Sequence, residues 1–516
     1  MGFQIIKADD NWQKRLVKGK WLVPELFGND KFVYGELTFG GDRQAVLSLN
    51  YAHEDLLVGV DYSRVIKIEH IIGRCLYDDE YGKQDSVAVD LYECFVSKLS
   101  TTLNFVLSGR QLLGAKIVAS DVWCGATNLE AETKQDITFK SISFGVKGLE
   151  DWCGGSFFTS TIKDEMRGAI IDYTCPEPVK IYDDLEVSVS IVYNWHGLDM
   201  SLGQTDMTIG HYSRVVIESK RGPLKYYGDE PSFEFHLKLI AIFFSILIGN
   251  GSFSFAIRGS HDGNCYNMLF TYCDKSSISK PRQKMVPWSV YRMIRSRMSI
   301  LLRTFISSFK NKYSELYTLH AYLNGFKRID GKSNSELLFA FESLYNQVLK
   351  EAGNAYAEQC EELIEKRRVK EAILKKCETE KEKRIVSANI NIALTFAMKL
   401  EVAMSECRKD FIGCLGQSTQ LWYGLRAILK NTRNSGAHSL ASKTFDGELY
   451  IAVHEFIKAG LIWLVLKGSG FSSKEMQHVL RYDYNFTWSL EIITKRICEG
   501  VNGAGSMGAM NETSNE

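Results

Sequence analysis

Two hydrophobic periodicities divide this chain and exclude a single uniform fold. From residue 31 to about residue 217, apolar and polar residues alternate in short runs rich in valine, isoleucine, tyrosine and phenylalanine. Beyond about residue 280 the apolar residues recur at intervals of about 3.6. The first pattern is typical of an antiparallel sandwich-like or barrel-like domain, and the second is typical of a helical bundle. We therefore predict an α+β multidomain protein.

The segments that carry these patterns set the predicted domain limits. Runs that predict strands are Phe32–Phe39, Ala45–Leu49, Val65–Ile68, Ser86–Tyr92, Ile137–Phe144 and Glu186–Val192. Runs that predict helices are Pro287–Asn324, Ser335–Arg384, Ser387–Cys407, Ser418–Asn434, Gly447–Lys467 and Ser473–Arg481. We place a β-rich domain at 1–279, a helical domain at 280–500 that begins with the linker Lys280–Lys284, and a disordered tail at 501–516.

Composition excludes several classes of protein. The 62 Lys and Arg residues balance the 62 Asp and Glu residues, so net charge gives no argument for nucleic-acid binding. The 12 cysteines form no C-x-x-C pair, and the first residues contain no apolar export signal, which together predict reduced, mostly buried thiols in the cytoplasm. The most apolar run, Leu237–Ile248, is shorter than the roughly 20 residues of a membrane span and predicts a buried helix.

The charges are unevenly distributed in the helical half. Between residues 280 and 328, 11 Lys or Arg residues occur with a single acid, Glu315. Such a bias is typical of a surface that follows a phosphate backbone, and it is equally typical of a solvated helix face. On the first interpretation, the RNA-binding candidates are Arg292, Arg295, Arg297 and Arg303. A second charged segment, Glu361–Arg384, mixes both signs and predicts an exposed helical arm with ion pairs one turn apart.

Few other motifs have the context that their chemistry needs. No nucleotide-binding glycine motif follows a predicted strand, and no G-x-S-x-G elbow occurs. His261, Cys265 and Cys273 could supply three zinc ligands, but a fourth ligand is not evident and the spacing fits no standard finger. Buried thiols beside a loop histidine are the favoured interpretation, and we expect no metal or other cofactor.

The string Arg433–His438 is the strongest candidate for chemistry. Its sequence is R-N-S-G-A-H; an amphipathic run precedes it, and a helical pattern begins near Glu448, so it lies at a helix end. On a continuous helix Asn434 and His438 share a face, and Arg433 can reach the same cleft. Alternatively these residues terminate a helix, with Asn434 and Gly436 as stop residues and the cations near the last carbonyls. Spacing alone leaves both interpretations open.

Both halves of the chain resemble a known family. An Arg-Asn-x-x-x-His string late in a helical bundle resembles the signature of the HEPN superfamily of RNases. The first half resembles the ApeA-type anti-phage branch of that superfamily, through Gly19–Glu25, Gly35–Phe39, Ser143–Trp152 and the apolar helix that ends at Gly249. The resemblance covers about Gly19 to Leu466.

The resemblance implies a metal-independent endoribonuclease in which Arg433 and His438 form the active site. Asn434 matches the polar position after the arginine. An acidic residue on an earlier helix often completes such sites, and Glu342 is our candidate. His438 would act as general base or acid while a 2′-hydroxyl attacks the adjacent phosphorus, which leaves a 2′,3′-cyclic phosphate and a 5′-hydroxyl. Arg433 would neutralise the phosphorane oxygens.

The same resemblance implies partners and a role. HEPN-like domains usually pair, so we expect a homodimer or a larger symmetric assembly. The expected substrate is RNA, with tRNA favoured, and the expected role is abortive infection, with a phage-derived activator sensed by the β-rich domain. Two rival hypotheses stay open: a non-catalytic dimerising sensor in which Arg433 and His438 are structural, and a zinc hydrolase that uses His261 and nearby thiols.

Overall fold

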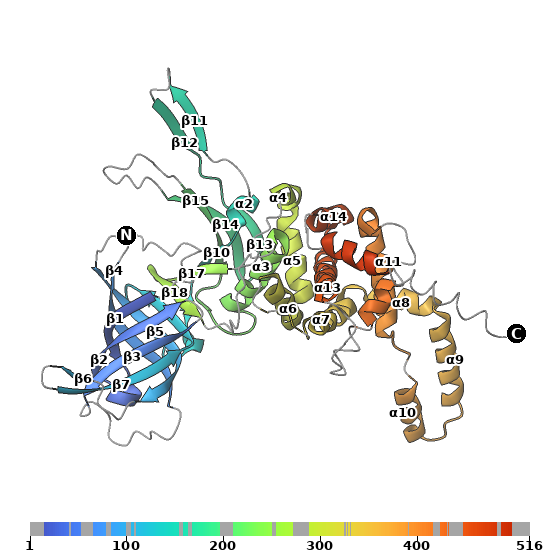
Figure 1. Ribbon diagram of the computed structural model, residues 1–516, viewed down its shortest axis with the longest axis horizontal. Coiled ribbons are helices and arrows are strands. Elements are labelled where there is room, and N and C mark those ends of the chain that lie inside the picture. The colour runs from blue at the N-terminus through green and yellow to red at the C-terminus, as the bar shows by residue number, and fades with distance from the viewer. Residues whose placement is uncertain are drawn as a thin grey trace. The chain divides into compact units, whose positions relative to one another are not determined.

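The computed structural model shows a β-rich part followed by a helical part (Figure 1). It describes residues 15–40, 43–52, 66–78, 84–99, 105–107, 110–153, 158–163, 168–196, 210–249, 254–271, 288–324, 327, 329–330, 332–390, 392–415, 424–430, 432, 447–481 and 487–497. The chain divides into two compact units: Met1–Met285 with Asn324–Lys327, here the β-rich unit, and Val286–Leu323 with Arg328–Glu516, here the helical unit. The predicted fold class is confirmed.

A closed antiparallel barrel forms the first part of the β-rich unit. Six strands follow one another around it in the order β5-β4-β1-β2-β3-β7, and a further pairing of β5 with β7 closes the ring. β6 extends the sheet beyond β7. The strands are β1 (Arg15–Leu22), β2 (Phe32–Gly40), β3 (Arg43–Ala52), β4 (Lys67–Asp78), β5 (Gln84–Leu99), β6 (Phe105–Leu107) and β7 (Arg110–Ala119), and a short helix, α1 (Pro24–Phe27), follows β1.

The alternating pattern in the sequence fills this barrel with apolar side chains. Because successive residues of a strand point to opposite faces, Val17 and Trp21 of β1 point inward with Leu37 of β2. Trp21 is fully buried, and its indole N–H donates to the carbonyl oxygen of Gly35 at 3.2 Å. A Cβ at Gly73, which lies opposite Trp21 on β4, would stand 2.4 Å from the indole ring. Glycine at position 73 therefore makes room for the tryptophan.

An open antiparallel sheet continues from the barrel. β8 pairs with β5, and the sheet then runs in the order β8-β18-β17-β10-β15-β14-β13. The combination is a barrel with an open sheet, whereas the sequence pattern did not distinguish a barrel from a sandwich. These strands are β8 (Asp121–Gly125), β10 (Ser141–Val146), β13 (Val179–Asp183), β14 (Val187–His196), β15 (Gly210–Ser219), β17 (Ser254–His261) and β18 (Asn264–Thr271), with two separate pairs, β9 (Thr138–Phe139) with β16 (Leu224–Lys225) and β11 (Phe158–Lys163) with β12 (Gly168–Tyr173).

One helix covers the open sheet and matches the most apolar run of the sequence. This helix, α3 (Phe233–Ile248), begins where the Ser232 hydroxyl accepts a hydrogen bond from the Phe235 N–H at 3.1 Å. It ends at Gly249, whose φ of 100° suits glycine. Nearly all of its side chains are buried, and Phe244 packs edge-on against Trp152 of α2 (Leu149–Cys153). The predicted buried helix is confirmed.

The helical unit consists of helices joined by short connections. The described helices are α4 (Trp288–Ile294), α5 (Met298–Phe309), α6 (Tyr313–Leu323), α7 (Ser333–Val348), α8 (Lys350–Gln359), α9 (Glu361–Leu374), α10 (Glu380–Asn389), α11 (Phe396–Leu415), α13 (Gly447–Gly468) and α14 (Ser473–Arg481). Residues 424–430 and 487–497 are also helical. α13 is the central helix, and it packs most extensively against α7.

Two long helices predicted from the sequence are in fact series of shorter ones. The run 287–324 forms α4, α5 and α6, separated by the single 3₁₀ turns Arg295–Arg297 and Lys310–Lys312. The run 335–384 breaks at Leu349, at Cys360 and again before Thr379. The extended backbone at Cys360 redirects the chain and lets Leu363 pack with Ala357. A 3.6-residue period continues through such breaks and so conceals them.

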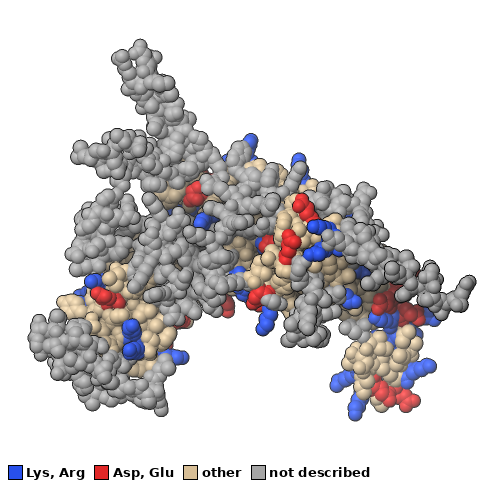
Figure 2. Space-filling model, viewed as in Figure 1, with Lys and Arg blue, Asp and Glu red and all other residues tan. Residues whose placement is uncertain are grey.

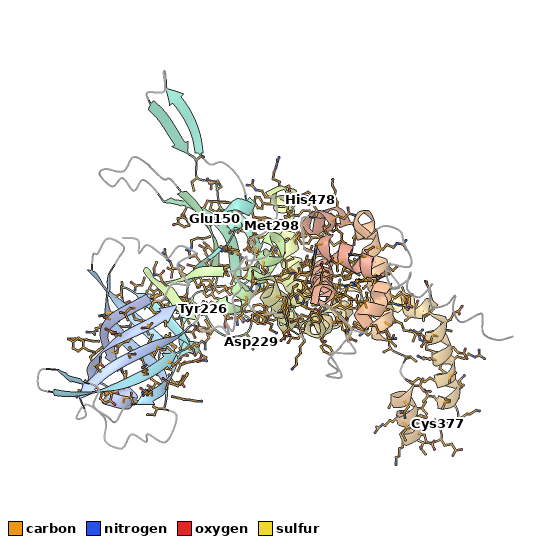
Figure 3. All side chains as sticks on the ribbon, in the orientation of Figure 1. Glu150, Tyr226, Asp229, Met298, Cys377 and His478 are labelled. Carbon is orange, nitrogen blue, oxygen red and sulfur yellow. The ribbon has the colours of Figure 1, made fainter. Side chains whose placement is uncertain are left out.

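α9 and α10 form the predicted exposed arm, although as two helices. Figure 2 shows Lys and Arg mixed with Asp and Glu over it, and Cys377 lies between its two helices (Figure 3). Lys366 pairs with Glu362 at 2.6 Å, one turn earlier. α10 begins with a capping box, in which the Thr379 hydroxyl accepts from the Glu382 N–H. The predicted local ion pairs are confirmed.

Candidate active site

Helical residues flank the Arg433–His438 string on both sides. The string itself, with Arg433, Asn434 and His438, lies outside the described residues. Residues 424–430 are helical, and so is Thr432, whose hydroxyl donates to the carbonyl oxygen of Ile428 at 2.8 Å. α13 begins at Gly447. The described helical residues nearest to the string are thus Thr432 before it and Gly447 after it.

The helix before the string is held firmly in the helical unit. Leu425 and Leu429, one turn apart, are both buried. A Cβ at Gly424 would stand 2.8 Å from Ile497, so this glycine allows close contact with helical residues 487–497. Arg426 pairs with Glu401 of α11 at 2.6 Å. These contacts fix the position from which the chain enters the string.

Glu342 lies on α7, and its carboxylate is engaged. Lys399 of α11 donates to Glu342 Oε1 at 2.9 Å, and both side chains are largely buried. The same ammonium lies 6.0 Å from the ring centroid of Tyr345, one turn further along α7. A partly buried carboxylate beside a lysine is suited to orienting a cation or a histidine.

Ser343, next to Glu342 on α7, hydrogen-bonds two charged side chains from outside α7. The Ser343 hydroxyl donates to Glu315 Oε1 at 2.5 Å and accepts from the Lys312 ammonium at 2.8 Å. Burial raises the pKa of Glu315, but the Ser343 hydrogen bond and the Lys312 charge outweigh it and leave this pKa below its usual value. α7 therefore carries two adjacent residues, Glu342 and Ser343, that join it to other helices through charged contacts.

The four arginines predicted to bind RNA differ in their surroundings. Arg292, Arg295 and Arg303 are exposed, and Arg295 lies over the ring of Tyr291. Arg297 instead contacts α14: its guanidinium donates to both carboxylate oxygens of Glu475 at 2.9 Å. Arg297 thus has a structural contact that the charge pattern did not predict.

The described histidines of the helical unit have structural contacts. His454 of α13 hydrogen-bonds Asn334 of α7 through Nδ1 at 3.0 Å, and burial followed by the Lys458 charge lowers its pKa to about 3. Burial lowers the pKa of His320 to about 4. His478 of α14, labelled in Figure 3, hydrogen-bonds Ser289 at 3.0 Å. His320 and His454 are therefore neutral at physiological pH.

Cys265, one of the two thiols near His261, does not match the sequence expectation of burial. His261 and Cys265 lie in the hairpin of β17 and β18, and Cys265 is exposed because this hairpin ends in a turn. Cys273 lies outside the described residues. Over the described part of the chain, no group of three His, Cys, Asp or Glu side chains is placed to hold a metal ion.

Sequence reasoning missed two sets of polar contacts. Lys399, the partner of Glu342, gave no signal because 57 residues separate the two. α13 is long and apolar enough to span a membrane, yet 72% of its apolar window is buried, and it serves as a core helix. Within it Glu455 and Lys458 form a buried pair at 2.5 Å. The presence of Glu455 and Lys458 within this apolar run was the feature of the sequence that could have predicted a buried ion pair.

Comparison with known proteins identifies the family through the β-rich unit. A family model described as ApeA N-terminal domain 1 matches residues 17–289, which is more than half of the chain. No curated protein and no solved structure matches this chain. The matched range contains the barrel, the open sheet and α3, and it ends at the start of α4. The chain therefore belongs to the family of ApeA-type anti-phage proteins.

Proposed function

We propose that this protein is a metal-independent endoribonuclease of the HEPN type that acts in anti-phage defence. The observation that carries the proposal is the Arg-Asn-x-x-x-His string of the sequence, which falls in the helical unit of a chain that begins with an ApeA N-terminal domain. Packed helical residues precede the string and follow it in the sequence, and rigid elements of this kind can hold an arginine and a histidine in fixed positions.

In the proposed reaction, His438 accepts the proton of an RNA 2′-hydroxyl as that oxygen attacks the adjacent phosphorus. The bond from phosphorus to the 5′-oxygen breaks, and protonation of that oxygen leaves a 2′,3′-cyclic phosphate and a 5′-hydroxyl. Arg433 binds the phosphorane oxygens through its planar guanidinium. Asn434 orients the histidine or the phosphate, and Glu342, held by Lys399, supplies a fixed negative charge to the site.

The wider role follows from the family. Cleavage of the cell's own RNA is toxic, so the β-rich unit gates the activity and responds to a phage-derived activator in the cytoplasm. The substrate is RNA, with tRNA as the favoured class, and Arg292, Arg295 and Arg303 contribute to binding it. Two copies pair so that two strings face one cleft, which makes the protein a homodimer or a larger symmetric assembly.

The direct test is cleavage of tRNA by the purified full chain in the presence of EDTA. Wild type should cleave, and His438→Ala and Arg433→Ala should each lose at least about 100-fold in rate, because general acid–base catalysis and oxyanion stabilisation typically contribute that much. Labelling the new 5′ ends should show hydroxyl groups. Loss of cleavage in EDTA, or full activity of His438→Ala, would sink the proposal.

Matched variants separate catalysis from folding. His261→Ala removes a partly exposed histidine from the β-rich unit and should leave the rate unchanged, whereas a zinc hydrolase built on His261 would lose activity. Glu342→Gln and Lys399→Met break the same ion pair from its two sides. If Glu342 acts in the site, Glu342→Gln should lower the rate of RNA cleavage more than Lys399→Met does, although the two variants should be about equally stable. If His438→Ala lowers the melting temperature and activity together, the non-catalytic sensor is favoured instead.

A further inference from the structure

One outer face of the barrel carries aromatic and basic side chains in register. Trp21 points inward, so its neighbour Lys20 points outward. Lys20 lies opposite Tyr34 of β2 and opposite Arg74 of β4. Arg74, Lys20 and Tyr34 therefore form one row across three strands spaced about 4.8 Å apart. Phe32, two residues before Tyr34, lies on the same face.

Each of the two aromatic rings on this face is accompanied by a cation. The Lys20 ammonium lies 5.1 Å from the centroid of the Tyr34 ring, and the Arg74 guanidinium lies 5.2 Å from that of Phe32. Tyr34 is nonetheless 65% exposed. A single exposed aromatic side chain needs no explanation. Two rings about 6.8 Å apart along one strand, each beside a cation, form a surface with defined chemistry.

Within the described part of the chain, the carboxylate nearest to this row is engaged by another cation. Glu36 lies in the next row and pairs with Lys18 at 3.1 Å. Among the residues that the structure describes, neither Lys20 nor Arg74 forms an ion pair. The row therefore presents two positive charges beside exposed aromatic surface, although the whole chain has no net charge.

We propose that this face, defined by Lys20, Phe32, Tyr34 and Arg74, binds single-stranded nucleic acid. Proteins that bind single strands without strict sequence preference combine cations that follow the phosphates with aromatic rings on which bases stack. Aromatic residues on an open sheet surface serve the same purpose in RNA recognition. A duplex keeps its bases stacked within itself and does not offer them to Tyr34. An acidic polypeptide would satisfy the charges but would leave the stacking surface unused.

This binding does not depend on the proposed nuclease. Single-stranded DNA has no 2′-hydroxyl, so a ribonuclease of the proposed mechanism cannot cleave it. An oligodeoxythymidine of about 12 nucleotides, long enough for a typical single-strand site, is therefore a suitable probe. Its binding reports on this face whether or not the chain cleaves RNA, and failure of either proposal leaves the other intact.

The experiment measures fluorescence anisotropy of the labelled oligonucleotide with the full chain over a range of salt concentrations. Tyr34→Ala should weaken binding at least about five-fold, because it removes one stacking surface. The double variant Lys20→Ala/Arg74→Ala should make the dependence of log affinity on log salt shallower by about 1.4, the loss of two phosphate contacts to a single strand. A duplex of equal length should bind more weakly than the single strand.

Matched controls come from the far side of the barrel. Phe95→Ala removes a 37% exposed ring from β5, and Lys98→Ala/Lys116→Ala removes an exposed pair of cations that face each other across β5 and β7. Both should leave affinity and salt dependence unchanged. Absence of binding, equal loss in the controls, or equal competition by poly-L-glutamate would each overturn the proposal. Unchanged circular dichroism establishes that each variant is folded.

Discussion

The β-rich unit and the helical unit bury polar side chains in different places. The cluster that fills the barrel is mainly apolar, and the Trp21 indole N–H within it bonds a backbone carbonyl. The fully buried carboxylate of Asp90 lies instead on β5, next to the strand that leads to the open sheet. It accepts from the Leu129 N–H at 3.1 Å and contacts His70 at 2.9 Å. This buried carboxylate thus lies where the barrel continues into the open sheet.

In the helical unit, polar pairs lie between the helices themselves. His454 joins α13 to Asn334 of α7, and the Trp463 indole N–H of α13 donates to Asp410 of α11 at 2.9 Å. Strands are joined by backbone hydrogen bonds, so a barrel interior needs no polar side chains. Helices satisfy their own backbones, so side chains alone decide which helices meet. We therefore expect the barrel to be sensitive to volume and the helical unit to be sensitive to pH.

Trp21→Ala should produce the largest loss of stability. It removes a fully buried indole from the barrel and leaves a cavity beside Gly73, which should lower the free energy of unfolding of the β-rich unit by about 3–5 kcal/mol. Urea denaturation of the full chain measures it. Tyr34→Ala, an exposed aromatic on the next strand, should cost less than about 0.5 kcal/mol. Similar losses in the two variants would contradict a packed barrel interior.

Acidification should destabilise the helical unit through His454 and His320. Their pKa values are about 3 and about 4 in the folded state, below the ordinary value of 6.5. The unfolded chain therefore takes up protons first, and stability falls as the pH drops below about 6.5. By pH 5 the loss is about 2 kcal/mol for each histidine. Urea unfolding midpoints measured between pH 7 and 5 should show this fall in stability. In His454→Gln the stability should depend less steeply on pH. An equally steep profile in His454→Gln would refute the assignment.

The elements that the sequence predicted well are those with local signals. Strand alternation gave β2 and β14, and the apolar runs gave α3, α13 and α14, whose ends agree with prediction to within a few residues. Closure of the barrel was not predictable, because it depends on the pairing of β5 with β7, which no local pattern records. Helix breaks were missed for a related reason: the apolar period continues across the turns at Arg295 and Cys360.

The candidate site shows the same limit. The Arg433–His438 string lies outside the described residues, so its place at a helix end and its role both stay predictions. Contacts between distant residues gave no signal. Lys399 meets Glu342, and Arg297 meets Glu475 from 178 residues away. A charge pattern shows that arginines are present in a segment, but not which of them the fold already uses.

Arg297→Ala should have the smallest of these effects on stability, and it tests that distinction directly. The guanidinium joins Glu475 and the carbonyl oxygen of Gly470, but the arginine side chain is 42% exposed, so the loss should be about 1 kcal/mol. Arg295→Ala, two residues earlier and exposed, should leave the helical unit as stable as wild type. RNA affinity should follow the opposite order, with the larger loss in Arg295→Ala, because Arg297 is already bound to a carboxylate. Urea denaturation measures the loss of stability in both variants, and RNA gel shifts measure the loss of RNA affinity. A greater loss of RNA affinity in Arg297→Ala than in Arg295→Ala would assign Arg297 to the RNA surface.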